Sequence, residues 1–347
     1  MARVGLVVLL SLCGLGAAAG ADEAPVSLRM ATIAPEGTAW ARLLADFSTE
    51  IERATQGGLR IKWTFGAGSG DELAELERVR AGELAGLAGA VMCQRVAPSL
   101  HAVEVAGLVE SDDEADTVLR RLRPLFDDEA RATPFTFLAL SSGFGHRVLF
   151  SREPVRTLDE LRSGRNWIYD LDEVEGAQLA LIGADLLPLP IDQAGRAYDS
   201  GRVDGFFSIP VAAVVFRYGV KARYFTDLRS MFLPACLIVS RAVLERLDGD
   251  TQRALGEAGE RLSVRFARLG RLEDAEILGR VFPREGLRAM PMSDAFRREY
   301  LEAARAANAR LGLVPLPLVR RVNGIVAEMR AGAAPSARSP PATAAAE

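Results

Sequence analysis

Arg147 is the residue of this 347-residue sequence whose type and position most clearly suggest binding chemistry. It lies inside a long β-type run, residues 133–151, where a charge is costly unless it is paired. A guanidinium in such a place suits a carboxylate, which it can hold through two parallel hydrogen bonds. That carboxylate can belong to a ligand or to an acid of the protein itself, and the sequence leaves both interpretations open.

Two pairs of side chains on expected strands add to this candidate site. Trp167 and Tyr169 are two residues apart on one expected strand and therefore share a face. Phe206 and Ser208 have the same relation on another strand. Aromatic pairs on one face line a cleft or pack in a core, and their spacing alone does not decide between these roles.

The sequence contains none of the motifs that would indicate catalysis or a bound metal. There is no G-x-S-x-G, H-E-x-x-H or P-loop, and the two histidines, His101 and His146, exclude a multi-histidine metal site. The three cysteines have no zinc spacing. The net charge of −4 argues against nucleic acid as a partner. We therefore expect no cofactor and no enzymatic activity.

The first residues have the features of a secretory signal peptide. Arg3 is followed by a short apolar run, and small residues end at Ala21, after which we expect cleavage. A membrane anchor is the alternative, but the apolar run is short and rich in Gly and Ala. The mature protein is then expected to be exported, and Cys93 and Cys236 can pair in an oxidising compartment. The sequence does not show whether these two cysteines meet.

Strand-like and helix-like segments alternate along most of the mature chain. Strands are expected near residues 26–33, 59–65 and 84–92, with amphipathic helices between them. A second unit after residue 157 repeats this order, and each unit contains a glycine-broken turn from helix to strand, RAGELAG (80–86) and DSGRVDG (199–205). The alternation predicts an α/β fold of two lobes, whose strand ends face a cleft where ligands bind.

Further segments set the expected boundaries of these lobes. The β-type run of residues 133–151 is longer than an ordinary strand and is expected to cross between the lobes. A long helix is expected over residues 248–282, and a loop over residues 221–228. We assign residues 25–136 and 212–252 to the first lobe, 137–211 and 253–330 to the second, and 331–347 to a disordered tail.

Three segments carry a resemblance to a known family over nearly the whole mature chain. They are GDELAELERVRAGELAG (70–86), GFGHRVLFSREPVRTLDELRSG (143–164) and LPLPIDQAGRAYDSGRVDGFFSIP (187–210). In these segments the sequence resembles the solute receptors of tripartite ATP-independent periplasmic (TRAP) transporters, the dicarboxylate-receptor (DctP-like) family. The resemblance implies two α/β lobes, a hinge of crossing strands and a long helix that spans both lobes.

The same resemblance implies a function and partners. A small organic ligand is trapped when the lobes close about the hinge. The receptor delivers it to a small and a large membrane subunit driven by an ion gradient, and the sequence is also similar to receptors with a periplasmic tetratricopeptide-repeat partner. Two other classes stay open. One is the binding protein of an ATP-driven importer, which an adjacent permease gene without an ATPase would exclude, and the other is a secreted α/β hydrolase, for which no nucleophile motif is present.

When the positions are compared one by one, the ligand site implied by the resemblance differs from the family pattern at several residues. One family arginine is matched by Arg147, but Trp167 stands where a second, acid-binding arginine is expected. Ser208 matches a family asparagine, and Ile191 matches a family aromatic residue. The expected ligand-binding residues are Thr32, Arg147, Trp167, Tyr169, Asp170, Ile191, Phe206 and Ser208. Because one charge is lost and apolar surface is gained, we expect a larger, partly apolar ligand rather than a C4-dicarboxylate.

Overall fold

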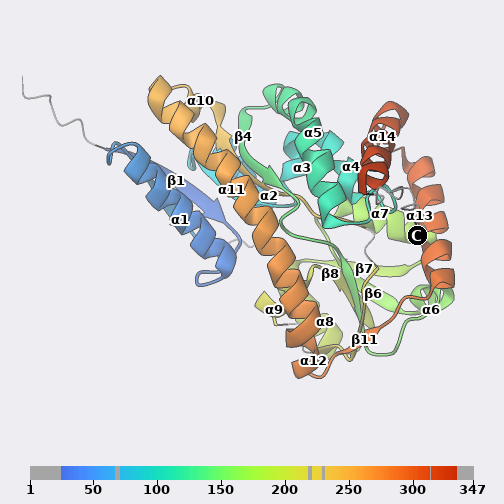
Figure 1. Ribbon diagram of the computed structural model, residues 1–347. Helices are drawn as coiled ribbons and strands as arrows, with labels where there is room; N and C mark the ends of the chain where they lie inside the picture. Colours follow the sequence, from blue (N-terminus) through green and yellow to red (C-terminus); the bar gives the residue numbers. More distant parts are fainter. Residues whose placement is uncertain (1–24, 67–70, 218–220, 229–230, 313, 334–347) are drawn as a thin grey trace, which may run out of the picture.

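The structure, a computed structural model, describes residues 25–66, 71–217, 221–228, 231–312 and 314–333 (Figure 1). The expected signal peptide and all but the first three residues of the expected tail lie outside these ranges. Residues 331–333 of that tail are the last residues of a helix. The described chain forms two α/β lobes, as expected, and each lobe is built around its own sheet.

The first sheet has five strands in the order β2-β1-β3-β10-β4. Their bounds are β1 (Val26–Thr32), β2 (Leu59–Thr64), β3 (Gly86–Gly89), β4 (Phe135–Ser141) and β10 (Ala235–Ser240). β1 is parallel to β2 and β3, as the alternation of strands and helices predicts. β10 lies between β3 and β4 and is antiparallel to both.

The second sheet has six strands in the order β11-β9-β5-β8-β6-β7. Their bounds are β5 (Val148–Ser151), β6 (Arg165–Tyr169), β7 (Asp185–Leu189), β8 (Gly205–Ser208), β9 (Tyr224–Thr226) and β11 (Arg288–Met290). The expectation of a loop over residues 221–228 is wrong, because this segment contains β9, which pairs with β5. Phe225 of β9 is buried in the second lobe's core, but three residues are too few to give a periodic signal.

Helices cover the faces of both sheets (Figure 1). Their bounds are α1 (Ala39–Ala54), α2 (Glu72–Arg80), α3 (Cys93–Val96), α4 (His101–Glu104), α5 (Asp112–Arg131), α6 (Leu158–Ser163), α7 (Glu173–Ile182), α8 (Ile191–Asp199), α9 (Pro210–Val215), α10 (Arg241–Leu244), α13 (Asp294–Leu311) and α14 (Leu316–Ala333), with a short 3₁₀ turn η1 (Pro98–Leu100). Side chains of Thr38, Asp71 and Asp172 accept hydrogen bonds from the first backbone N–H groups of α1, α2 and α7. These caps satisfy donors that a helix leaves unpaired at its start.

One long helix, α11 (Gly249–Glu276), runs along both lobes and confirms the expected lobe-spanning element (Figure 1). It continues into η3 (Ile277–Val281) and α12 (Phe282–Arg284). Its first two thirds pack in the first lobe's core through side chains such as Leu262 and Phe266. Ile277 and Phe282 pack in the second lobe's core. The helix therefore ties the two lobes together along one side.

In addition to α11, two neighbouring segments connect the lobes by crossing from one sheet to the other. The expected single run of residues 133–151 is in fact β4 and β5, joined by residues 142–147. The second crossing segment joins β9 to β10 and pairs with the first, since the Arg147 N–H donates to the Met231 carbonyl at 3.0 Å. The Leu233 N–H donates to the Gly145 carbonyl at 2.9 Å. These paired segments agree with the expected hinge of crossing strands.

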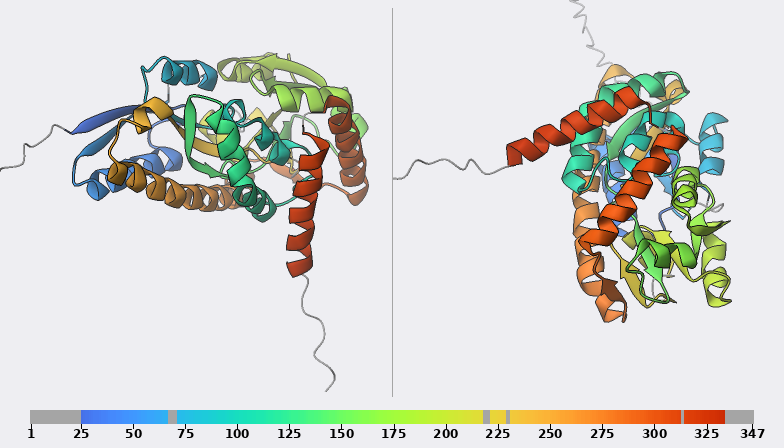
Figure 2. Two further views of the ribbon diagram at one scale, coloured as in Figure 1. Left: turned by 90° about the horizontal axis from the view of Figure 1, so that it is seen from above. Right: turned by 90° about the vertical axis from the view of Figure 1, so that its right-hand side faces the viewer.

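Strand pairing and core packing refine the boundaries between the lobes. Residues 212–252, assigned from the sequence to the first lobe, contain β9 of the second sheet and β10 of the first. α14, placed with the second lobe, contributes Leu318, Val322 and Val326 to a core of the first lobe. Figure 2 shows α14 turning away from α13, and it packs against α5. The last helix therefore returns to the first lobe.

A disulfide links Cys93 of α3 to Cys236 of β10, with a Cα–Cα distance of 6.0 Å. This answers the question that the sequence leaves open. Both cysteines are buried in the first lobe's core, and the bond fastens α3 to β10, an inner strand of the first sheet. Among the described helices, none is both long and apolar enough to cross a membrane.

Candidate ligand-binding site

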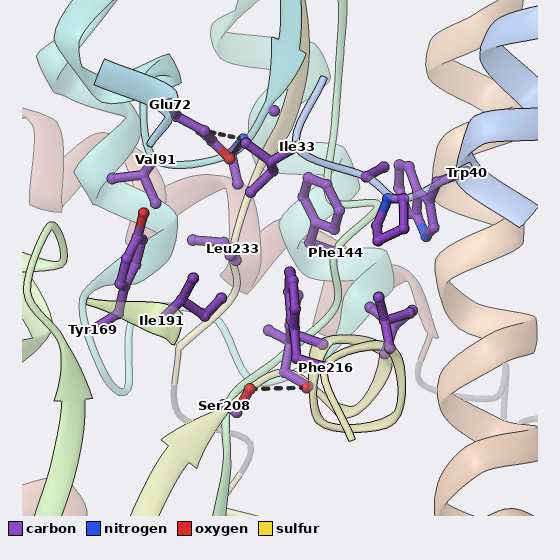
Figure 3. Close-up of a pocket in the computed structure, with 18 of the residues that line it drawn as sticks. Ile33, Trp40, Glu72, Val91, Phe144, Tyr169, Ile191, Ser208, Phe216 and Leu233 are labelled. Carbon is purple, nitrogen blue, oxygen red and sulfur yellow. Dashed lines mark hydrogen bonds between the residues drawn. The ribbon is translucent and has the colours of Figure 1, made fainter. Parts of the chain in front are cut away.

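A cavity of about 120 Å³ lies between the two lobes, beside the crossing segments (Figure 3). Its walls come from the ends of β1 and β3 and the start of α2, from the crossing segments, and from β6, β8 and α9. The lining residues are 32–35, Thr38, Trp40, Glu72, 89–91, Phe144, Arg147, Trp167, Tyr169, Ile191, 207–209, Val211, Ala212, Val215, Phe216 and Leu233. Carbon atoms dominate this surface, so the cavity suits a ligand with an apolar body.

The second lobe contributes aromatic and small polar groups to the cavity. Trp167 of β6 is buried, and its indole N–H donates to the Leu189 carbonyl at 2.9 Å. Tyr169, two residues further, points its hydroxyl across the cavity toward Val91 of the first lobe (Figure 3). The Ser208 hydroxyl donates to the Ile209 carbonyl at 3.2 Å. The shared face expected for Trp167 and Tyr169 is therefore directed at the cavity.

Glu72, the first residue of α2, is a buried carboxyl group in the first lobe's wall. Oε2 accepts a hydrogen bond from the backbone N–H group of Ala90 at 2.9 Å (Figure 3) and another from that of Met92 at 3.1 Å. Burial raises the pKa of Glu72 to about 7, although these amides favour the charged form. A Cβ at Gly89 would lie 2.6 Å from Glu72 Cδ, so the carboxyl group of Glu72 occupies the space that a side chain at Gly89 would need.

Trp40 and Phe144 form an aromatic stack at one end of the cavity (Figure 3). Their ring centroids are 4.3 Å apart, and Trp40 also stacks on Phe266 of α11 at 4.5 Å. The Trp40 indole N–H donates to Glu273 Oε2 at 2.9 Å. This stack joins α1, a crossing segment and the long helix, so the cavity end is built from all three.

Arg147 lines the cavity, but its guanidinium is paired with acids of the protein itself. Nη2 forms an ion pair with Asp172 Oδ2, and Nη1 lies 3.2 Å from Glu175 Oε2. Arg147 and both acids are almost fully buried. Burial raises the pKa of Glu175, and the positive charge of Arg147 partly offsets this. The sequence leaves open whether Arg147 pairs with a ligand's carboxylate or with an acid of the protein. In the structure it pairs with two acids of the protein.

Six of the eight residues expected from the sequence meet at this cavity: Thr32, Arg147, Trp167, Tyr169, Ile191 and Ser208. Asp170 and Phe206 are not among its lining residues. Asp170 is exposed and lies in the turn that follows β6, one residue beyond Tyr169. Phe206 packs in the second lobe's core, where it stacks on Phe150 with ring centroids 4.8 Å apart.

Sequence reasoning missed several lining residues. Trp40 lies at an apolar position of an expected helix, so the sequence pattern predicts a core residue. Glu72 lies at the start of an expected helix, where an acidic residue is common and does not by itself indicate a binding site. Phe144 lies between two glycines of the crossing segment. Of these three residues, only Phe144 has a sequence signal that places it near the cleft, namely its position in a glycine-flanked crossing segment.

A second buried charged cluster lies at the hinge. His146 is 1% exposed, with Nε2 2.8 Å from Asp227 Oδ1 and Nδ1 3.5 Å from Asp274 Oδ2. Burial raises the pKa of Asp274 to about 7, and the nearby His146 works against this. Within the described ranges, no group of three or more His, Cys, Asp or Glu side chains is placed to hold a metal ion.

Two lobes with separate sheets, joined by crossing segments around a cavity, define the class of two-lobed solute-binding proteins. The chain matches the family described as "Bacterial extracellular solute-binding protein, family 7" over residues 30–310, and it belongs to that family. The match includes every residue that lines the cavity.

Individual relatives are distant in sequence. "Uncharacterized protein YiiZ" of Salmonella typhimurium is 22% identical over 222 residues, which are 62% of this chain and 67% of that protein. A TRAP periplasmic solute binding protein from Pseudomonas putida F1, solved with bound D-glucuronate, has a TM-score of 0.78 at 16% identity over 86% of this chain and 97% of its own. One from Haemophilus influenzae RdAW with bound L-gulonate has a TM-score of 0.79 at 15% identity, over 86% of this chain and 99% of its own. These likenesses establish the shared fold.

Proposed function

We propose that this protein is the solute-binding receptor of a TRAP-type secondary transporter and captures a small organic ligand between its lobes. The observation that carries the proposal is the cavity, because both lobes and the crossing segments supply its walls. Movement at a hinge opens and closes such a cavity while each lobe keeps its own fold. The family and the similar fold of solved TRAP receptors support this function.

The ligand contacts in this proposal come from both sides of the cleft. Thr32 contributes from the first lobe, and Tyr169, Ile191 and Ser208 contribute from the second, while Trp167 forms a wall. The sugar acids in the similar structures are polar ligands. The aromatic and aliphatic lining here favours a ligand with a larger apolar part.

Export and delivery complete the proposal. A signal peptide over residues 1–21 sends the chain to the periplasm, and the disulfide is consistent with an oxidising compartment. There the loaded receptor docks on the small and large membrane subunits of the transporter. A tetratricopeptide-repeat partner stays a prediction.

The test is the retention of a ligand by the cavity. Protein purified from cells that naturally produce it is expected to carry one small molecule per chain in native mass spectrometry. Ala212→Trp places an indole in the cavity and should abolish this retention. Ala306→Trp is the matched control, because Ala306 lies on the exposed side of α13.

Two results would contradict the proposal. If Ala212→Trp retains the molecule as well as the wild type does, the cavity is not the ligand site. If the wild-type protein carries no molecule and takes none from an extract of its own cells, the receptor function itself is wrong.

A further inference from the structure

The ion pairs of Arg147 place two carboxylates of the protein where a bound acid would have to lie. Asp172 and Glu175 both belong to the start of α7, which follows directly after the cavity-lining strand β6. Their side chains are 11% and 1% exposed, and that of Arg147 is 8% exposed. A guanidinium with two buried carboxylates already against it offers no net positive charge to a third.

The rest of the lining supplies no replacement for this charge. Among the residues that the structure describes, the lining contains two charged side chains, Arg147 and Glu72. Glu72 is an acid, and its carboxylate is held by backbone amides on the opposite wall. An anionic ligand would therefore meet an arginine that is already neutralised on one side and an acid on the other, and it would lose its hydration without gaining a counter-charge.

The position of Trp167 is a second indication that the cavity does not bind an anionic ligand. The indole stands where the family resemblance implies an acid-binding arginine, and its N–H donates to the Leu189 carbonyl. The ring adds an apolar wall beside Tyr169 and Ile191. Apolar cavities of about 150 Å³ admit a benzene-sized molecule. The cavity here, about 120 Å³, is of the same scale, so one ring or a short branched chain fits it.

We propose that the ligand of this receptor is an uncharged molecule with an apolar, ring-sized body and no carboxylate, and that Asp172 and Glu175 take the place of the ligand's acid on Arg147. This inference rests on the proposed receptor function and narrows its ligand class. Arg147 then acts as a positioning residue, because it fixes α7 against the crossing segment instead of holding the ligand. Ser208 and Tyr169 place hydroxyl groups on the second lobe's wall of the cavity.

Matched pairs of small probes test the inference on the intact protein. The pairs are benzyl alcohol with benzoate, and cyclohexanemethanol with cyclohexanecarboxylate, measured by calorimetry at neutral pH. We expect each alcohol to bind at least about tenfold more tightly than its acid, because the alcohol keeps the apolar contacts and needs no counter-ion. An acid that binds as tightly as its alcohol, or more tightly, overturns the inference and leaves the receptor function standing. If no probe binds, both the inference and the proposed cavity are wrong.

A pair of variants tests whether the acids that pair with Arg147 are the reason that a ligand carboxylate is excluded, or whether any loss of negative charge nearby has the same effect. Asp172→Asn removes one partner of Arg147, and benzoate is expected to bind this variant at least about tenfold more tightly than it binds the wild type. Glu173→Gln removes the same charge from the same turn, but its carboxylate pairs with Arg95 and not with Arg147, so benzoate binding should be unchanged. If Asp172→Asn does not fold, Glu175→Gln gives the same comparison. Equal benzoate binding in wild type and a folded variant would overturn the inference.

Discussion

Breaking the Cys93–Cys236 disulfide tests how firmly the first lobe depends on a link between distant parts of the chain. The two cysteines are 143 residues apart. A cross-link over a loop of this length removes about 17 cal/mol/K of entropy from the unfolded chain, which stabilises the folded state by about 5 kcal/mol at 25 °C. We therefore expect Cys93→Ala/Cys236→Ala to lower the free energy of unfolding by about 4–5 kcal/mol.

Urea unfolding followed by far-UV circular dichroism measures this change. The dependence of the unfolding free energy on urea should also become steeper in the double variant, because its unfolded chain exposes more surface. The wild-type protein with a reductant in the unfolding buffer is the control, since reduction of the unfolded chain should reproduce the loss. The double variant itself should be insensitive to the reductant. A loss below about 1 kcal/mol in both cases would refute the loop-entropy argument.

Three further predictions follow from buried groups. Arg147→Met should lower the free energy of unfolding by about 3–5 kcal/mol in urea titrations, because it leaves two buried carboxylates without their counter-ion; a loss under about 1 kcal/mol would show that the pairing is not needed. Burial raises the pKa values of Glu72 and Asp274 to about 7, so the folded protein binds more protons than the unfolded chain, and the free energy of unfolding should fall as the pH rises from about 4 to about 7. Urea titrations across this range should show a shallower fall in Glu72→Gln and in Asp274→Asn, and equal slopes in all three proteins would contradict these pKa shifts. Gly270→Ala should lower the free energy of unfolding by about 1–3 kcal/mol, because a Cβ there would lie 2.0 Å from the Gly143 carbonyl oxygen. Gly256→Ala on the same helix is the control: its Cβ meets nothing within 4 Å, so thermal melts should show an unchanged or higher melting temperature. Equal melting temperatures of the two variants would show that α11 can move away from the crossing segment.

Most of the fold could be predicted, because its signals are local. The amphipathic spacing of α1, the Asp71 cap of α2 and the long apolar stripe of α11 each lie within one segment. β9 was missed because its pairing with β5 brings together residues about seventy positions apart, which no local pattern records. Gly143 and Gly145 are compatible with a bend inside residues 133–151, but the assignment of β4 and β5 to different sheets depends on strand pairing, which no local pattern records.

The candidate site was only partly predictable. Alternation along a strand shows that Phe206 and Ser208 share a face, but it does not show that only Ser208, at the end of β8, reaches the cavity while Phe206 packs in the core. The buried arginine was recognised from its type and place, whereas its partner Asp172 became evident only from the packing of α7 against the crossing segment. The sequence therefore identifies which side chains of this site carry charge or aromatic rings, and the tertiary structure shows which groups those side chains contact.

The place of β10 between β3 and β4 has a consequence for the order of biosynthesis. An N-terminal fragment that ends before residue 235 has a gap in the middle of its first sheet, so it cannot complete that lobe. By the time β10 is made, β5 to β9 of the other lobe already exist. The first sheet is complete only when β10 has been made, and the second only when β11 has been made, so neither lobe can be completed from the first two thirds of the chain alone.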